Sequence, residues 1–260
     1  MEKKLIILCV SAALFFSCKN KNETVTETTT NKTEKPLSKA DSIVNQAIEA
    51  HGGKLYEQAD YSFIFRDKKY RFKNNNSSNT YSSEIQKGDS LILDVMTADH
   101  FERTINGKSQ NLNKDDSAKY SESLNSVIYF TTLPYKLQDA AVNKKFIEET
   151  AIKGKKYDLI KVTFSQDGGG KDFDDEYSYW INKDIHKIDY LAYNYHVNEG
   201  GVRFRAAFNS RVIDGITFQD YINYEAPVGT DLKDLPKLYE EGKLKELSKI
   251  LTEHVVNNHK

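Results

Sequence analysis

One short stretch, residues 165–180 ("SQDGGGKDFDDEYSYW"), gathers the residue types that most often do chemistry. Three glycines followed by a lysine would suit a phosphate-binding loop, whose backbone cradles phosphate oxygens and whose pattern is G-x-x-x-x-G-K-[ST]. Here Gly170-Lys171 is followed by Asp172, and Ser165 stands where the first glycine is required. The stretch therefore lacks the pattern of a phosphate-binding loop.

Calcium is the second chemistry that this stretch suggests, because carboxylate oxygens are the usual ligands of that ion. Asp172, Asp174 and Glu176 have the spacing of the first three ligands of an EF-hand loop. The same register places Tyr177 where a glycine is needed and Lys183 where the bidentate glutamate belongs. We therefore expect no bound metal and interpret the stretch as a solvated acidic hairpin. A loose calcium site at the three acidic residues is the alternative.

Nucleophiles and bases do not form a recognisable catalytic pattern. The six histidines lack H-E-x-x-H spacing, and no serine lies in a G-x-S-x-G elbow. His51 ends the first predicted helix, where a cation would interact favourably with the helix dipole. We expect a non-enzymatic protein that uses no cofactor. A hydrolase whose site is assembled only by folding is the alternative.

Helical patterns occur at both ends of the chain and once in its middle. Apolar residues recur at helical spacing over residues 40–48, with Ser38 placed to cap the helix and two glycines placed to end it. Residues 115–143 are predicted to be helical in two pieces, broken before Pro134. The tail over residues 231–257 also shows apolar residues at helical spacing.

Strand patterns fill the rest of the chain. Short aromatic and β-branched runs predict about five strands over residues 60–112, where Asn106-Gly107 is a strong hairpin signal, and about five more over residues 156–225. No regular alternation of strands and helices is visible, which argues against a parallel α/β fold. The order predicts an α+β protein with one large curved antiparallel sheet, a half-barrel, with helices covering one face.

The N-terminus predicts export and a lipid anchor. A basic start and an apolar run too short to span a membrane predict a signal peptide over residues 1–17. Ser17-Cys18 resembles the end of a bacterial lipobox, and this resemblance implies that Cys18 becomes the lipidated N-terminus. Residues 18–36 are polar and predict a flexible tether, followed by a single domain over residues 37–260. An ordinary signal peptide with an incidental cysteine is the alternative.

The charge balance and the aromatic content limit the kinds of partner. With 37 basic and 38 acidic residues the net charge is −1, so no nucleic-acid partner is expected. The chain has 16 Tyr and 13 Phe, many on predicted strands, where Arg203 and Arg205 share one face. The candidate ligand-binding residues are Tyr179, Tyr190, Tyr195, Arg203, Arg205, Tyr221 and Phe130.

The segments "FIFRDKKY", "NSVIYFTTLPYKLQDAAV", "DGGGKDFDDEYSYWIN" and "GGVRFRAAFNSR" resemble an uncharacterised family of exported bacterial lipoproteins. The layout is similar to the LolA/LolB-type half-barrel lipoproteins. This resemblance implies an envelope protein anchored to the outer membrane. The tether has no acidic run next to Cys18, which favours the periplasmic face, with the cell surface as the alternative. It also implies a lipid or other hydrophobic ligand held between a concave sheet and residues 115–143. A structural or interaction module with a filled core is the competing hypothesis.

Overall fold

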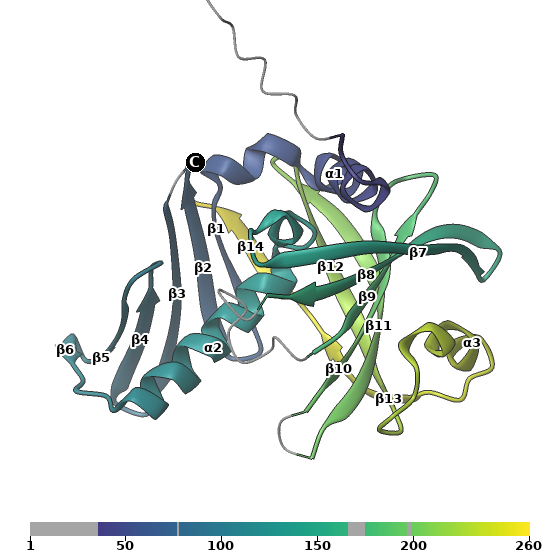
Figure 1. The fold of residues 1–260 in the computed structure, drawn as a ribbon. Coiled ribbons are helices and arrows are strands. Elements are labelled where there is room, and N and C mark those ends of the chain that lie inside the picture. Colours follow the sequence, from purple (N-terminus) through teal and green to yellow (C-terminus); the bar gives the residue numbers. More distant parts are fainter. Residues whose placement is uncertain (1–35, 77, 166–174, 197–198) are drawn as a thin grey trace, which may run out of the picture. The chain divides into compact units, whose positions relative to one another are not determined.

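The computed structural model describes residues 36–76, 78–165, 175–196 and 199–260. Leu37–Lys260 forms one compact unit, which is built from two seven-stranded antiparallel sheets and a few helices (Figure 1). Among the described residues, no helix combines the length and the apolar character that a membrane span requires.

The first sheet contains most of the N-terminal half of the chain. Its strand order is β14-β1-β2-β3-β4-β5-β6, so the last strand of the protein pairs with the first. The strands are β1 (Asp60–Phe65), β2 (Lys68–Asn75), β3 (Ser78–Lys87), β4 (Ser90–Met96), β5 (Phe101–Ile105), β6 (Lys108–Ser109) and β14 (Glu253–Asn257). The expected hairpin at Asn106-Gly107 is present, with both residues at positive φ (50° and 75°) between β5 and β6.

The second sheet is an antiparallel meander with the order β13-β12-β11-β10-β9-β8-β7. The strands are β7 (Val142–Ile152), β8 (Lys155–Phe164), β9 (Tyr177–Asn182), β10 (Ile188–Tyr195), β11 (Gly201–Ile213), β12 (Ile216–Ala226) and β13 (Lys245–Ile250). β8 and β9 pair with Val162 opposite Tyr177. Residues 166–174, which make up most of the expected acidic hairpin, lie outside the described residues.

Local signals in the sequence account for α1 (Lys39–His51). Ser38 Oγ accepts a hydrogen bond from the Asp41 N–H at 3.1 Å, which satisfies one of the free amide groups of the first turn. Gly52 adopts φ 143° and ends the helix, and its backbone N–H bonds the carbonyls of the last turn. The short 3-10 helix η1 (Gly53–Gln58) then leads into β1.

The long helix α2 (Lys114–Thr131) lies between the two sheets. Leu124 and Ile128 are buried in a core cluster with the aromatic residues of β1 and β2. One residue further along, Tyr129 and Phe130 pack against the second sheet. A 3-10 turn, η2 (Tyr135–Gln138), follows Pro134 in place of the second helical piece expected there.

The second sheet is covered on both faces, which we call the helix face and the α3 face. On the helix face, α1 and the end of α2 pack on a cluster that contains Tyr179, Leu191 and Tyr221. On the α3 face, η4 (Leu232–Asp234) and α3 (Leu235–Glu240) cover a cluster that contains Trp180 and Phe204. Alternate residues of each strand therefore belong to different cores.

The α+β class is confirmed, but the expectation of one large sheet with helices on one face is not. The strands divide into two sheets because the 18-residue α2 lies between them and packs on both. The second sheet carries helices on both faces, because its strands are apolar on both faces and each face needs cover.

The expected C-terminal helix over residues 231–257 is wrong after Glu240. β13 completes the edge of the second sheet against β12, and β14 completes the edge of the first sheet against β1. The chain crosses from one sheet to the other at Thr252, whose backbone N–H donates to Asp220 Oδ1 at 2.9 Å and whose carbonyl accepts from Arg211. Pairing with two free strand edges outweighs the local helical pattern.

Candidate functional site

A cavity of about 470 Å³ lies between α2, the turn that joins β1 to β2, and the helix face of β11, β12 and β13. Its apolar wall consists of Phe65, Tyr70, Val127, Phe130, Tyr221 and Ile250. Its polar groups include Arg205, Gln219, Asn223 and Ser248. The lining therefore combines apolar and polar side chains in comparable amounts, and polar groups beside an apolar surface can orient a small ligand.

Arg205 is the charged group at the wall of this cavity. Its guanidinium lies 4.0 Å from the centre of the Phe130 ring, and its Nη2 donates to the Tyr193 hydroxyl at 2.8 Å. The residue is only 8% exposed. Its Nε is buried and has no hydrogen-bond partner among the described residues. A buried donor without a partner costs free energy.

Asn223 lies directly opposite Arg205 in the pairing of β11 with β12. Both side chains line the cavity, and directly opposed residues of an antiparallel pair are close neighbours. The Asn223 Oδ1 is also buried, without a hydrogen-bond partner in the described part of the chain. The two opposed residues therefore carry one unsatisfied donor and one unsatisfied acceptor.

The phenol of Tyr221 completes this part of the wall. Its hydroxyl accepts a hydrogen bond from Gln219 Nε2 at 3.1 Å. Burial raises the pKa of Tyr221, so its hydroxyl stays protonated and the phenol stays neutral. Gln219 Nε2 also donates to the Ile188 carbonyl at 2.9 Å, which fixes the amide.

The turn between β1 and β2 supplies the charged rim of the cavity. Arg66 and Asp67 are exposed and Lys68 is half-buried. Asp67 is the one acidic side chain among the described residues that line the cavity, against three basic ones. No histidine or cysteine of the described part of the chain lines it.

The structure brings three of the seven candidate ligand-binding residues to this cavity, namely Phe130, Arg205 and Tyr221. Tyr179 lies on the same face but is fully buried, and its hydroxyl is 2.9 Å from that of Tyr129. Burial raises the pKa of Tyr179, so it is a neutral core residue.

The other three candidates lie away from the cavity. Arg203 and Tyr195 bind each other, with Arg203 Nη2 donating to the Tyr195 hydroxyl at 2.6 Å. Tyr190 is directly opposite Trp180 and packs on Phe204 and Tyr239, so it belongs to the α3 face.

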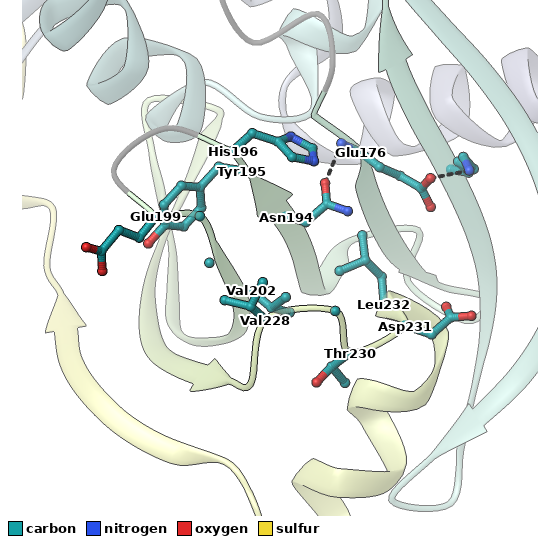
Figure 2. Close-up of a pocket in the computed structure, with 14 residues that line it drawn as sticks. Glu176, Asn194, Tyr195, His196, Glu199, Val202, Val228, Thr230, Asp231 and Leu232 are labelled. Atoms are coloured by element: carbon teal, nitrogen blue, oxygen red, sulfur yellow. Dashed lines mark hydrogen bonds and ion pairs between the residues drawn. The ribbon is translucent and has the colours of Figure 1, made fainter.

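A second hollow of about 590 Å³ lies at the ends of β9, β10 and β11, beside the connection that follows β12 (Figure 2). Tyr195 lines it, and its apolar wall includes Val202 and Leu232. Its main polar groups are already paired: the Glu176 N–H donates to Asn194 Oδ1 at 2.8 Å, and the Glu176 carboxylate pairs with Lys161. It offers less unsatisfied chemistry than the first cavity.

The proposed lipidation site and most of the calcium candidates cannot be placed. Cys18, Asp172 and Asp174 lie outside the described residues. Glu176 is described and forms an ion pair with Lys161. Among the residues that the structure describes, no group of three or more histidine, cysteine, aspartate or glutamate side chains is arranged to hold a metal ion.

His51 differs from the sequence expectation of a cation at the end of a helix. It is 1% exposed, and its Nε2 accepts a hydrogen bond from the Ile188 N–H at 3.4 Å. Burial, assisted by the charge of Lys187, lowers the pKa of His51 to about 3. The imidazole is therefore neutral and joins α1 to the second sheet.

Sequence reasoning missed Asn223, Gln219 and Ile250 as cavity residues. Alternation along residues 216–225 places Gln219, Tyr221 and Asn223 on one face, so a signal existed for two of them. Ile250 was hidden by the helical assignment of the tail.

Residues 39–252 match a family of unknown function, DUF6503. The chain belongs to this family. No protein with a curated description matches the chain.

Several solved structures are similar to this family member. A LolA superfamily protein from Nitrosomonas europaea aligns with a TM-score of 0.44 at 13% identity, over 74% of this chain and 88% of the other. A DUF1329 family protein from Desulfovibrio piger aligns with a TM-score of 0.45 at 11% identity, over 85% and 94%. The lipoprotein LppX of Mycobacterium tuberculosis aligns with a TM-score of 0.28 at 13% identity, over 73% and 97%. The expected resemblance to an uncharacterised family is confirmed.

Proposed function

We propose that this protein is a lipoprotein of the cell envelope that binds a hydrophobic ligand between α2 and the helix face of the second sheet. In this proposal the helix face acts as the concave wall of a half-barrel and α2 closes it. The observation that carries the proposal is the cavity of about 470 Å³ whose walls include Phe130, Tyr221 and Ile250. Its volume falls within the range of roughly 300 to 1,000 Å³ that is typical of small-ligand sites.

The physical basis of binding is the removal of apolar surface from water. Such burial contributes about 25 cal/mol per Å² of apolar area, so a long alkyl chain would gain several kcal/mol in this cavity. Side chains from α2, from β1–β2 and from β12–β13 meet at the wall. Because these elements are distant in sequence, the cavity is a product of the whole fold.

The membrane anchor is the second part of the proposal. Cys18 would carry the lipid, residues 18–36 would act as the tether, and the folded domain would face the periplasm from the outer membrane. A Cys18→Ser variant should lose lipid labelling and move from the membrane to the soluble fraction. Retention of that variant in the membrane would contradict lipid anchoring.

Co-purifying ligand tests the binding proposal. The full chain is extracted from membranes with detergent, and its organic extract is analysed by mass spectrometry. Two neighbouring variants on α2 provide a matched pair, because Ser126 lines the cavity and Asn125 does not, and both side chains are exposed. Ser126→Trp should reduce the bound apolar molecule severalfold, whereas Asn125→Trp should not.

An empty extract from the wild-type protein would contradict ligand binding. It would favour an interaction module of the envelope, whose partner a stoichiometric pull-down would identify. Equal ligand content in the Ser126→Trp and Asn125→Trp proteins would place the ligand elsewhere on the molecule.

A further inference from the structure

We infer that the ligand is an acidic amphiphile, whose anionic oxygen binds Arg205 and whose neighbouring O–H group donates to Asn223. The inference rests on the proposed function, because it names the headgroup of the ligand in the same cavity. A 3-hydroxy fatty acid and an alkyl phosphate monoester both present this chemistry on an apolar chain.

Three of the six arginines pair with buried aspartates, and Arg205 is not among them. Arg71, Arg103 and Arg211 each pair with an aspartate that is at most 4% exposed: Asp60, Asp94 and Asp220, at 2.6, 2.6 and 3.2 Å. Arg203 lies opposite Glu225 across the β11–β12 ladder. Arg205, two residues further along the same face, lies opposite the neutral Asn223.

No carboxylate among the described residues pairs with Arg205, although only 8% of this residue is exposed. Transfer of a charged group out of water is unfavourable even after relaxation of the protein. The rings of Phe130 and Tyr193 and the Tyr193 hydroxyl stabilise the guanidinium, but all of these partners are neutral. An anion in the cavity would supply the opposite charge that no described residue supplies.

The second unsatisfied atom narrows the headgroup further. Asn223 Oδ1 is an acceptor, and a fully ionised carboxylate has no proton to donate to it. Because the Arg205 guanidinium is charged, an anionic oxygen is its most favourable acceptor, and an O–H or N–H donor beside that oxygen would also satisfy Asn223. A hydroxy acid and the monoanion of a phosphate monoester meet this requirement, whereas a hydrocarbon, an ester or a simple alcohol does not.

The charged residues at the rim of the cavity also favour a negatively charged headgroup. Arg66 and Lys68 flank Asp67 on the turn between β1 and β2. Together with Arg205, the described lining carries three basic groups against one acidic group. A negatively charged headgroup is therefore attracted from the entrance to the wall.

Three probes of equal chain length test the inference on the full chain after co-purifying lipid has been removed: 3-hydroxyhexadecanoic acid, hexadecyl phosphate and hexadecanol. Binding is measured by calorimetry. At least one of the two acids should bind the wild-type protein roughly 10- to 100-fold more tightly than the alcohol, because hydrogen bonds to charged groups contribute that much. The acid with the higher affinity distinguishes a fatty acid from a phosphate monoester.

Two variants and a control make the test specific to Arg205. Arg205→Met should reduce the affinity for the acid to about that for the alcohol. Arg203→Met is the control, because Arg203 shares the strand and the face but does not line the cavity. Asn223→Asp keeps the shape of the side chain and supplies an internal counter-ion, so it should weaken acid binding and leave alcohol binding unchanged.

Equal affinities of the wild-type protein for the acids and the alcohol would overturn this inference and leave the proposed function standing. Equal losses of acid affinity in Arg205→Met and Arg203→Met would also overturn it. Failure of all three probes to bind would overturn the proposed function and the inference together.

Discussion

Replacement of His51 should remove a large part of the acid sensitivity of the fold. The imidazole is 1% exposed and lies between α1 and the second sheet, and burial lowers its pKa from 6.5 to about 3. The unfolded chain therefore takes up a proton below about pH 6.5 that the folded protein does not. This group stabilises the fold fully above that pH, and its contribution is lost as the pH falls towards 3.

The size of the effect follows from the two pKa values. Between about pH 7.5 and about pH 4.5, the linkage of this single group lowers the free energy of unfolding by about 2.6 kcal/mol. His51→Gln keeps an acceptor for the Ile188 N–H and does not titrate, so its stability should depend less on pH by this amount. Carboxylates titrate in both proteins and cancel in the comparison.

Urea unfolding at several pH values measures the difference. The wild type and His51→Gln are compared over the same range, with His196→Gln as a control, because the His196 side chain is 68% exposed. The control should follow the wild type. Parallel pH profiles for the wild type and His51→Gln would refute the account of His51 as a buried neutral group.

Three further predictions concern stability and are read from urea or thermal unfolding. Trp180→Ala removes a fully buried ring from the α3 face and should lower the free energy of unfolding by about 3 to 5 kcal/mol. Val212→Ala changes a residue that is 61% exposed and should lower it by less than about 0.5 kcal/mol. Similar losses in the two variants would contradict the packing of the α3 face. Gly107→Ala should cost about 1 kcal/mol, because φ is 75° and nothing lies within 4 Å of an added methyl; a neutral result would argue against the tight turn. Deletion of residues 253–260 should expose the edge of β1 and lower the free energy of unfolding by several kcal/mol. Loss of helical signal rather than strand signal in circular dichroism would contradict the pairing of β14 with β1.

Elements with strong local signals could be predicted from the sequence. The cap at Ser38 and the stop at Gly52 are local chemistry, and α1 lies where they predict. The same holds for the turn at Asn106-Gly107 and for the meander from β8 to β12, whose strands alternate with turn residues. In each case the signal and the structure involve residues that are close in sequence.

Elements that depend on distant partners could not be predicted. Leu244, Leu247 and Leu251 have helical spacing, but this segment meets the edge of β12 and forms β13. β7 was missed because two adjacent pairs of charged residues interrupt the strand pattern of "VNKKFIEETAI", and its pairing with β8 decides its structure. The division into two sheets likewise depends on where α2 packs.

The candidate site was predictable in part for the same reason. Strand alternation is sufficient to place Arg203 and Arg205 on one face, as the structure shows. It does not give the register between strands, and only the register places Asn223 opposite Arg205 and Tyr190 opposite Trp180. The unsatisfied pair at the cavity wall is therefore visible only in three dimensions.

The most direct test of the proposed function locates the ligand on the protein. A photoreactive long-chain fatty acid is bound to the full chain and cross-linked, and the labelled peptides are identified by mass spectrometry. The account predicts labels on α2 between residues 123 and 131 and on residues 219–223 or 248–252, which line the cavity. Labels confined to residues 194–202, at the second hollow, would contradict it.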